Sequence, residues 1–376
     1  MQVEKSKNPN SLSRRSRRLI QRLGHPVLTS VLALGAATSV GLYGVGVASA
    51  SSVGHVKSQS SYRVSATWSP VGTTPHFTGV DYKLGRVFVS NLVGNLTGNL
   101  TVLNLQGKVL HTVKLGGQVH TVEVDQATGM VYVTDIARGI LDVVNASTYA
   151  VTPIQVASHL HGLAVSNSLH IAVVTDVANS RVYLINTTTD EVMTPKGGIL
   201  VGNNPWGVAI DHAHKLAYVA STGIDPFSKS KVNPAGDYVS VINLVTDSVS
   251  KPITVGPHPW NLAVTQSGAV YVGVQSAGEV AVIKDGRVVK DIPVRTSPHG
   301  VAYDPVRKVV LVNNSGSNNV SVISTETNSV VQTVDVGIQP QGIAIDPLTG
   351  DAYVANQGSN QGTNQGPPSV SVLSPT

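Results

Sequence analysis

Seven copies of one motif, each about 42 residues long, occupy most of this chain. Each copy reads approximately Pro-His-Gly-Val-Ala-x-Asp, x-Val-Tyr-Val-x-Asn, Val-Ser-Val-Ile-Asn and Val-x-x-x-Ile-x-Val-Gly. The copies align on the residue that ends the first run, which is Asp81, Asp125, Ser166, Asp211, Thr265, Asp304 or Asp346. This repeat constrains the fold more than any other feature, because every copy must form a similar unit and pack against its neighbours.

Four short β-rich runs make up each copy. The runs are rich in Val, Ile and Tyr, and Gly, Asn, Asp and Ser separate them, which is typical of strands joined by tight turns. One copy therefore predicts one four-stranded antiparallel sheet, which is the blade of a β-propeller and not a unit of a helical solenoid. The chain is predicted to be an all-β, seven-bladed β-propeller.

The second strand of each copy has a characteristic sequence, as in Val131-Tyr132-Val133-Thr134-Asp135 and Ala352-Tyr353-Val354-Ala355-Asn356. These runs resemble the YVTN family of β-propeller repeats, and the resemblance covers nearly everything after residue 62. The resemblance implies a propeller fold and leaves the activity open, because such propellers host binding, scaffolding and several unrelated enzymatic activities.

The two ends of the repeat region predict how the ring closes. The seventh copy has three strands and ends after Ser369-Val370-Ser371-Val372-Leu373. Residues 64–72 have the pattern of an outer strand and match residues 331–337 of the sixth copy. Pairing of this N-terminal strand with the last blade would complete the blade and remove two exposed sheet edges. We therefore expect one domain over residues 62–376, and a monomer.

Residues 1–50 have the pattern of an export signal. Seven Lys or Arg residues precede an apolar stretch over residues 26–47, and Ala48-Ser49-Ala50 forms an A-x-A cleavage site. The Ser16–Arg22 run resembles a twin-arginine signal, and an ordinary Sec signal also fits. An uncleaved membrane anchor is a third reading, which the A-x-A site disfavours. We expect residues 51–61 to be a linker, and the mature protein to be periplasmic, cell-surface or extracellular, with no membrane span.

Removal of this leader changes the charge of the protein. The chain has 26 basic and 21 acidic residues, and loss of seven basic residues and Glu4 leaves 19 and 20, a net charge of −1. No basic stripe remains for a phosphate backbone, so nucleic-acid binding is not expected. Because the chain has no cysteine, any metal ion would be bound by nitrogen and oxygen atoms.

Residues five positions before each alignment point carry the most informative chemistry. They are His76, His120, His161, Trp206, Trp260, His299 and Gln341. In a propeller this position begins the innermost strand, so the seven side chains should converge at one mouth of the central channel. Imidazole suits Cu, Zn or Fe, so the four histidines, on blades six, one, two and three, form a candidate metal site. The alternative is a polar channel lining without metal, since histidine is common here in the wider repeat family.

A second series lies two residues earlier and contains Thr74, Gln118, His159, Asn204, His258, Ser297 and Gln339. Strand alternation would place these side chains on the same side of the chain as the first series. We therefore expect His159 and His258 to join Trp206, Trp260 and Gln341 at the mouth, where a small molecule, a glycan or a protein would bind. The two tryptophans would serve as aromatic platforms.

Glu123 is the other outlier. Its equivalents in the other six copies are Gly79, Ala164, Ala209, Ala263, Ala302 and Ala344. A carboxylate among such small residues needs a partner, because burial of an unpaired charge is costly. Glu123 is a candidate catalytic residue, either as a general base or as the group that orients a neighbouring histidine. The alternative is a local ion pair. The other histidines of the repeat region, including His212, are interpreted as surface or structural residues.

Two insertions interrupt the repeat, over residues 222–237 and 357–369. Both follow a second strand, so they should border the same mouth as the histidines. Two classes of function fit these observations. The first is an exported protein that binds a ligand or partner at the mouth and contains a histidine-bound metal. The second is a metal-dependent enzyme, for which copper oxidoreductases and a metal-dependent lyase on seven-bladed propellers are analogies of fold alone.

Overall fold

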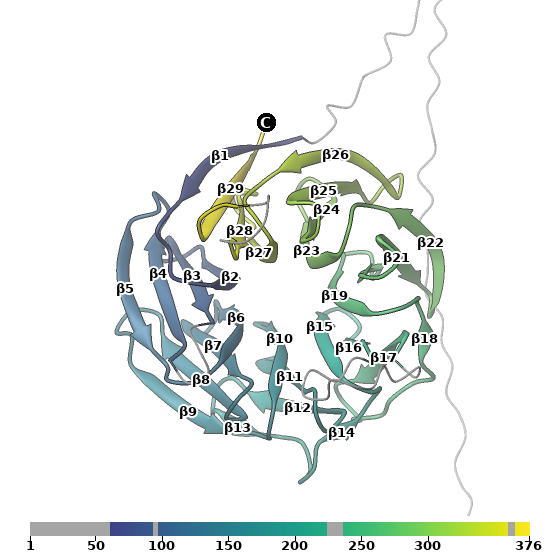
Figure 1. Ribbon diagram of the computed structural model, residues 1–376. Coiled ribbons are helices and arrows are strands. Elements are labelled where there is room, and N and C mark those ends of the chain that lie inside the picture. Colours follow the sequence, from purple (N-terminus) through teal and green to yellow (C-terminus); the bar gives the residue numbers. More distant parts are fainter. Residues whose placement is uncertain (1–60, 93–96, 224–235, 360–364) are drawn as a thin grey trace, which may run out of the picture. The chain divides into compact units, whose positions relative to one another are not determined.

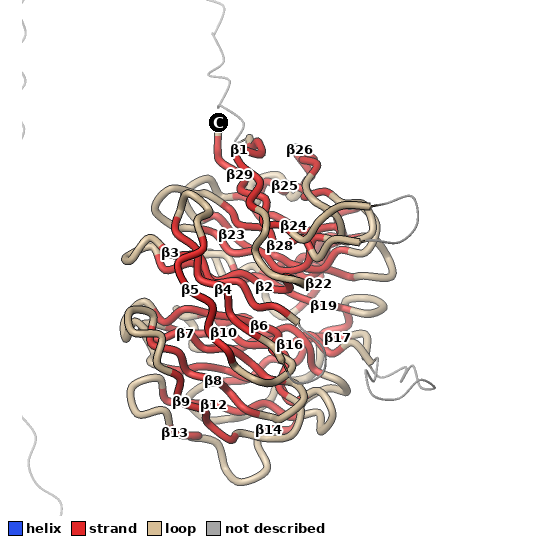
Figure 2. The backbone as a smooth tube through the Cα atoms, turned by 60° about the vertical axis from the view of Figure 1, so that its left-hand side comes forward, coloured by secondary structure: helices blue, strands red, loops and turns tan. Residues whose placement is uncertain are grey.

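The computed structural model describes residues 61–92, 97–223, 236–359 and 365–376, which form seven antiparallel sheets around a central axis (Figure 1). Each sheet has four strands, except that one blade gains a short fifth strand. These residues contain strands and loops and no helix, as the backbone trace also shows (Figure 2). The prediction of an all-β, seven-bladed propeller is confirmed.

Each blade begins with its innermost strand, and the chain then passes outwards (Figure 1). The strands of blade one are β2 (Pro75–Asp81), β3 (Arg86–Asn91), β4 (Asn99–Asn104) and β5 (Val109–Lys114). Those of blade two are β6 (Val119–Asp125), β7 (Met130–Asp135), β8 (Ile140–Asn145) and β9 (Val151–Gln155). Those of blade three are β10 (Leu160–Ser166), β11 (Ile171–Asp176), β12 (Arg181–Asn186), β13 (Glu191–Val192) and β14 (Ile199–Leu200). Both β13 and β14 pair with β12, so the outer edge of blade three is divided between two short strands.

The remaining blades follow the same order. Blade four contains β15 (Pro205–Asp211), β16 (Leu216–Ser221), β17 (Tyr238–Asn243) and β18 (Ile253–Thr254). Blade five contains β19 (Pro259–Val264), β20 (Val270–Val274), β21 (Glu279–Lys284) and β22 (Arg287–Pro293). Blade six contains β23 (Pro298–Asp304), β24 (Val309–Asn314), β25 (Asn319–Ser324) and β26 (Ser329–Asp335). Blade seven contains β27 (Pro340–Ile345), β28 (Ala352–Asn356), β29 (Ser369–Pro375) and β1 (Tyr62–Trp68).

The ring closes as the sequence predicts. Strand β1 pairs antiparallel with β29, with Val64 opposite Leu373 and Trp68 opposite Val370. The hydroxyl of Tyr62 donates a hydrogen bond of 2.6 Å to a carboxylate oxygen of Asp304, and so joins the closing strand to blade six. The N-terminal strand therefore supplies the outer strand that the last copy lacks, and β29 has no free edge.

The residue on which the copies align has a structural role in the first turn of each blade. The carboxylate of Asp81 accepts hydrogen bonds from the backbone N–H groups of Lys83 and Leu84, at 3.0 and 2.9 Å. Equivalent bonds form at Asp125, Asp211, Asp304 and Asp346. Such Asx turns stabilise the reversal between the first and second strands. The repeated Asp is therefore explained by local folding and does not indicate a catalytic group.

Apolar side chains pack between neighbouring blades and not in one central core. The cluster between blades one and two contains Phe88, Leu100, Val131 and Val133, all with no exposed surface. Similar clusters lie at the other six junctions. Since the sheets bury both faces in this way, the axis itself is left to the side chains of the innermost strands. The channel lining is thus the part of the fold that is free to vary for function.

Among the described residues, no helix is long and apolar enough to cross a membrane. The proposed export signal (1–50), all but the last residue of the linker (51–61) and the middle of both insertions lie outside the described residues. The predictions for these segments therefore stay predictions.

Closure by β1 gives a stability prediction. Trp68 is 7% exposed, and its indole packs at a centroid distance of 5.5 Å against Tyr353 of blade seven. Replacement of Trp68 by Ala should lower the free energy of unfolding by roughly 3–5 kcal/mol, because it leaves a cavity where the closing strand packs between blades seven and one. Urea denaturation measures this change. The exposed neighbour Thr67 is the control, and Thr67→Ala should change stability by less than about 0.5 kcal/mol. Equal effects of the two changes would contradict closure by β1.

Candidate functional site

The seven predicted mouth residues form a ring around the axis, which we call the inner ring. Each is the second residue of its innermost strand. From blade one to blade seven they are His76, His120, His161, Trp206, Trp260, His299 and Gln341. Each innermost strand has an irregular register at this point; in β2, His76 and Phe77 lie together opposite Ser90 alone. The same shift recurs in the other six strands. Such a bulge bends the strand and changes the direction of the side chain, so all seven are re-aimed in the same way.

Hydroxyl groups of the second strands hold these bulges and join neighbouring blades. Ser90 accepts a hydrogen bond of 3.0 Å from the backbone N–H of Phe77 and donates one to the carbonyl of His120 in blade two. The same hydroxyl bridge recurs at the next two junctions, from Thr134 to the carbonyl of His161 and from Thr175 to that of Trp206. A backbone donor that the bulge removes from the ladder is thus satisfied.

The aromatic side chains of the inner ring pack against one another in sequence. The centroid distances are 3.9 Å for His76–His120, 3.8 Å for His120–His161, 3.9 Å for His161–Trp206, 4.1 Å for Trp206–Trp260 and 5.1 Å for Trp260–His299. The centroids of His299 and His76 are 6.1 Å apart, on either side of blade seven, which contributes Gln341. The structure therefore brings together the four histidines and the two tryptophans that the repeat alignment selects.

The inner ring is buried, yet many of its nitrogens lack partners. The histidines His76, His120, His161 and His299 are between 2% and 8% exposed. Their Nδ1 atoms, together with Nε2 of His161 and Nε1 of both tryptophans, are buried without a hydrogen-bond partner. Burial of unsatisfied polar atoms is costly, so this cluster is the kind of exception that calls for an explanation beyond packing.

Burial also keeps these imidazoles neutral. It lowers the pKa of His76 to about 4 and that of His299 to about 3, with nearby His76 adding to the effect at His299. Burial lowers the pKa of His120 and His161 well below its usual range, and the neighbouring histidines lower it further. A weak contact of His161 with the backbone of Trp206 acts in the opposite direction, without reaching hydrogen-bond geometry. Neutral imidazole is the form that binds a metal ion.

The donor atoms of the inner ring suit a transition metal, whereas their present directions do not. A ligating nitrogen must lie about 2 Å from the ion. Within the described ranges, no group of three or more His, Cys, Asp or Glu side chains has a geometry that would hold an ion. Imidazole rings would have to turn before three of them could share one metal ion.

Four residues of the second predicted series do not follow strand alternation. The innermost strands begin one residue later, and Asn204, His258, Ser297 and Gln339 have φ angles between 52° and 57°. In this left-handed conformation a side chain does not continue the alternation of the strand. His258 instead contacts its own blade, where its Nδ1 lies 2.5 Å from the hydroxyl of Ser276. Half-buried His159 also lies one residue before its innermost strand, β10, but its backbone is not left-handed.

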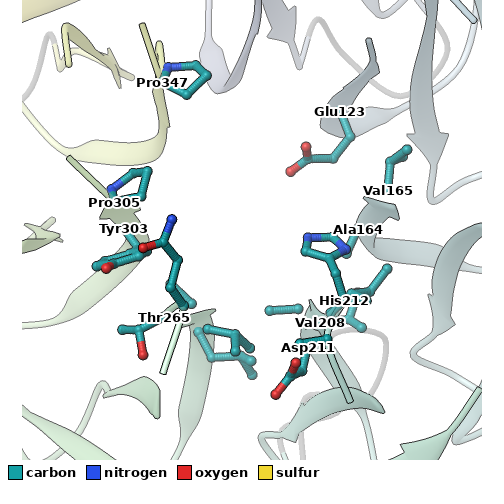
Figure 3. A pocket seen from close by; sticks show the side chains of 17 residues that line it. Glu123, Ala164, Val165, Val208, Asp211, His212, Thr265, Tyr303, Pro305 and Pro347 are labelled. Atoms are coloured by element: carbon teal, nitrogen blue, oxygen red, sulfur yellow. The ribbon is translucent and has the colours of Figure 1, made fainter. Parts of the chain in front are cut away.

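Glu123 lies farther along the innermost strand than the inner ring. It lines a pocket of 570 Å³ at the other end of these strands, which we call the channel pocket, and its carboxyl group points into the open space (Figure 3). A second pocket of 310 Å³ shares Glu123, Tyr303 and Pro347 with the channel pocket, so the two adjoin. Glu123 therefore does not join the histidines of the inner ring. No hydrogen bond or ion pair links it to another described residue.

The environment of Glu123 favours its neutral form. Its side chain keeps some accessible surface because it faces the pocket, although protein surrounds that pocket. Burial raises the pKa of Glu123 to about 8. A carboxyl group with such a shift in a concave site is a candidate functional group, because structural carboxylates are usually paired. No ion pair joins Glu123 to another described residue, and a catalytic role for it stays a prediction.

Sequence reasoning missed the residues that surround Glu123. Asp211 and His212 of blade four, Thr265 of blade five and Tyr303 of blade six line the channel pocket (Figure 3). His212 was interpreted as a surface or structural residue, but its ring faces the pocket, and its Nδ1 lies 2.8 Å from the hydroxyl of Ser166. The repeat does contain a signal for these pocket-lining residues. The residue after each alignment point lines one of the two pockets in all seven copies: Tyr82, Gln126, Asn167, His212, Gln266, Pro305 and Pro347.

The described ends of both insertions lie on the inner-ring side. The backbone N–H of Gly223 bonds to the carbonyl of Asn203, and that of Gly358 bonds to the carbonyl of Ile338, at 3.3 and 3.0 Å. Both carbonyls belong to the chain just before an innermost strand. On the same side, Ile136 and Val177 pack with Trp206 in a small apolar cluster. The inner ring is therefore partly covered, whereas the channel pocket opens at the opposite end.

Comparison with known proteins identifies the fold alone. No protein-family model and no curated protein matches the chain. A solved structure titled Kuenenia stuttgartiensis hydrazine synthase contains a chain of similar fold, with a TM-score of 0.64 and 18% sequence identity. The similarity covers 80% of this chain and 96% of that chain. At this identity the match supports the propeller architecture, and it carries no information on activity.

The lowered histidine pKa values give a pH prediction. Below about pH 6.5 the unfolded chain binds protons at His76 and His299, whereas the folded protein does not until the pH falls to about 4 and 3. The free energy of unfolding should therefore decrease as the pH falls from 6.5 towards 4, by up to about 1.4 kcal/mol per pH unit for each such histidine.

Urea denaturation at pH 7.0, 5.5 and 4.5 measures this slope. The change His299→Gln should make the slope shallower, whereas His111→Gln, at an exposed position, should leave it unchanged. Stability that stays constant over this range would show that the imidazoles are not buried as described.

Proposed function

We propose that this protein is an exported β-propeller that binds a small molecule in its central channel. The observation that carries the proposal is the channel pocket, a cavity of 570 Å³ that contains the unpartnered carboxyl group of Glu123. A volume of a few hundred cubic ångströms with a few converging polar groups is typical of small-molecule sites. Export and membership of the YVTN family remain parts of this proposal, supported by the leader and the repeat motif.

The sequence along the innermost strands supports a binding role. Bulky aromatic side chains fill the inner ring, while Gly or Ala follows three residues later in six blades. The narrow ring and the small residues beyond it create a cavity that is constricted at one end. Because blade packing does not require Glu123, a small residue would fold equally well at this position. A costly carboxyl group that the fold does not need is best explained by a ligand.

A cavity-filling change tests this proposal. Ala209 lines the pocket at the position equivalent to Glu123 in blade four, so Phe at this position should project into the cavity. Compounds that raise the melting temperature of the wild-type protein in a small-molecule screen should lose most of this effect with Ala209→Phe. The matched control is Ala150→Phe, at an exposed position on the outside of blade two. Hits that stabilise all three proteins equally would contradict binding in the channel.

A second candidate function is favoured by the unpaired nitrogens of the inner ring. In this proposal His76, His120, His161 and His299 bind Cu, Zn or Fe, which would supply Lewis-acid or redox chemistry to a copper-type oxidoreductase or a lyase. The neutral, buried imidazoles support it, and the ring rotations that ligation requires weigh against it. Trp206 and Trp260 would shield such a site on blades four and five.

Elemental analysis distinguishes this second candidate. Protein produced without a histidine tag and dialysed against Cu²⁺ or Zn²⁺ should retain about one equivalent of metal, and the double change His120→Ala and His161→Ala should abolish retention. The folded state should persist in the double variant, because the blades supply the apolar core. A wild-type protein that retains no metal would remove the enzyme proposal.

A further inference from the structure

Glu123 is the feature of the channel that the fold leaves unexplained. Six of the seven equivalent positions hold Gly or Ala, and the seventh directs a carboxyl group into the cavity (Figure 3). No lysine or arginine is among the residues that line either pocket. The described chain therefore provides no cationic partner for this carboxyl group inside the channel.

The imidazole of His212 does not supply the missing positive charge. Its Nδ1 is fixed by the hydroxyl of Ser166, which also accepts a hydrogen bond of 3.3 Å from the backbone N–H of Leu169. Ser166 then has its own proton free for Nδ1, an arrangement that suits the neutral ring. Burial also lowers the pKa of His212, against the opposing effect of Asp211. A neutral His212 provides a polar contact for a ligand, but not a countercharge.

The walls of the channel pocket combine apolar and polar side chains. Ala164, Val208, Leu262 and Ala263 line it, and the polar groups lie mainly at its rim. The cavity therefore suits a compound with an apolar body and one strongly polar group, because the walls would bury the body and Glu123 would meet the polar group.

We infer that the channel pocket binds an organic ammonium ion, a small amine with an apolar body, whose cationic nitrogen pairs with the carboxylate of Glu123. This inference rests on the proposed function and specifies its ligand class. An ammonium group satisfies a carboxylate that the chain leaves unpaired, and enclosure in the cavity strengthens the interaction relative to water.

Binding of this kind has a proton signature. In the free protein the pKa of Glu123 is about 8, so most molecules carry the neutral carboxyl group at pH 7. Pairing with an ammonium ion ionises that group, so binding at pH 7 should release close to one proton into solution, and at pH 9 very little. A neutral ligand that accepts a hydrogen bond would instead keep the proton on Glu123, and it would bind more weakly above pH 8.

The other titratable groups that line the two pockets are Asp211, His212, Tyr82 and Tyr303. Asp211 is paired with His214 at 2.7 Å, and burial raises the pKa of Tyr303 above its ordinary value. Because these groups are also present in a Glu123 variant, the difference between the wild type and that variant isolates the contribution of Glu123.

Isothermal titration calorimetry with matched probes tests the inference. The probes are phenethylamine and hexylamine, with phenethyl alcohol and hexanol as neutral analogues and 3-phenylpropionate as an anionic one. The amines should bind the wild-type protein at least about tenfold more tightly than their analogues, as expected for a desolvated charge pair. Titrations at pH 7 in two buffers of different ionisation enthalpy should report the released proton.

Two substitutions at the site and one control complete the experiment. Glu123→Gln keeps the shape and Glu123→Ala restores the residue of the other blades, and both should weaken amine binding about tenfold or more and abolish proton release. Glu191→Gln, on the exposed strand β13, should change neither quantity.

The outcomes separate this inference from the proposed function. If neutral or anionic probes bind in a way that Ala209→Phe abolishes, while amines have no advantage, the ligand class is wrong and the channel remains a binding site. Equal amine affinities for the wild type and Glu123→Gln would also overturn the inference. If no probe binds the wild-type protein, the inference fails. Whether the channel binds a small molecule is then decided by the melting-temperature screen that compares the wild type with Ala209→Phe.

Discussion

The pairing of β1 with β29 is the interaction on which the rest of the structure depends. A propeller blade buries its faces against the blades on both sides, so a ring that failed to close would expose the edge and one face of its last sheet. The closing strand contributes Tyr62 to the packing between blades six and seven and Trp68 to that between blades seven and one, and the Tyr62 hydroxyl reaches Asp304. Seven similar sheets can then share a common axis, and the innermost strands meet there.

The innermost strands divide the channel into chemically different zones. At their beginning, bulges direct aromatic side chains towards one another, and the resulting inner ring is buried and rich in unpaired nitrogens. Three residues later, Gly and Ala leave open space, into which Glu123 projects (Figure 3). The strands end at a polar rim that includes His212 and Gln266. The position of a residue along its innermost strand thus determines whether it fills the axis, leaves it open or makes it polar. This separates the candidate metal site from the candidate ligand site.

Much of this arrangement could be predicted from the sequence, because the repeat converts positions along the chain into positions around a ring. Blade count, closure and the gathering of His76, His120 and His161 follow from alignment of the copies. The position of His258 did not follow, since its left-handed backbone cancels the strand alternation on which that prediction relied. The surroundings of Glu123 did not follow either, because alternation and spacing do not reveal that the small residues around it enclose a cavity.

The hydroxyl bridges are distributed unevenly around the axis. Ser90, Thr134 and Thr175 connect blades one to four through the carbonyls of the inner ring. At the next two junctions Ala220 and Gly273 occupy the equivalent positions, and neither has a side chain that could form such a bridge. Blade five therefore lacks these hydroxyl bridges on both of its sides, and together with blade four it forms one wall of the channel pocket. A ligand in this pocket would therefore lie between Glu123, on a blade that hydroxyl bridges join to both neighbours, and a blade that has no such bridge on either side.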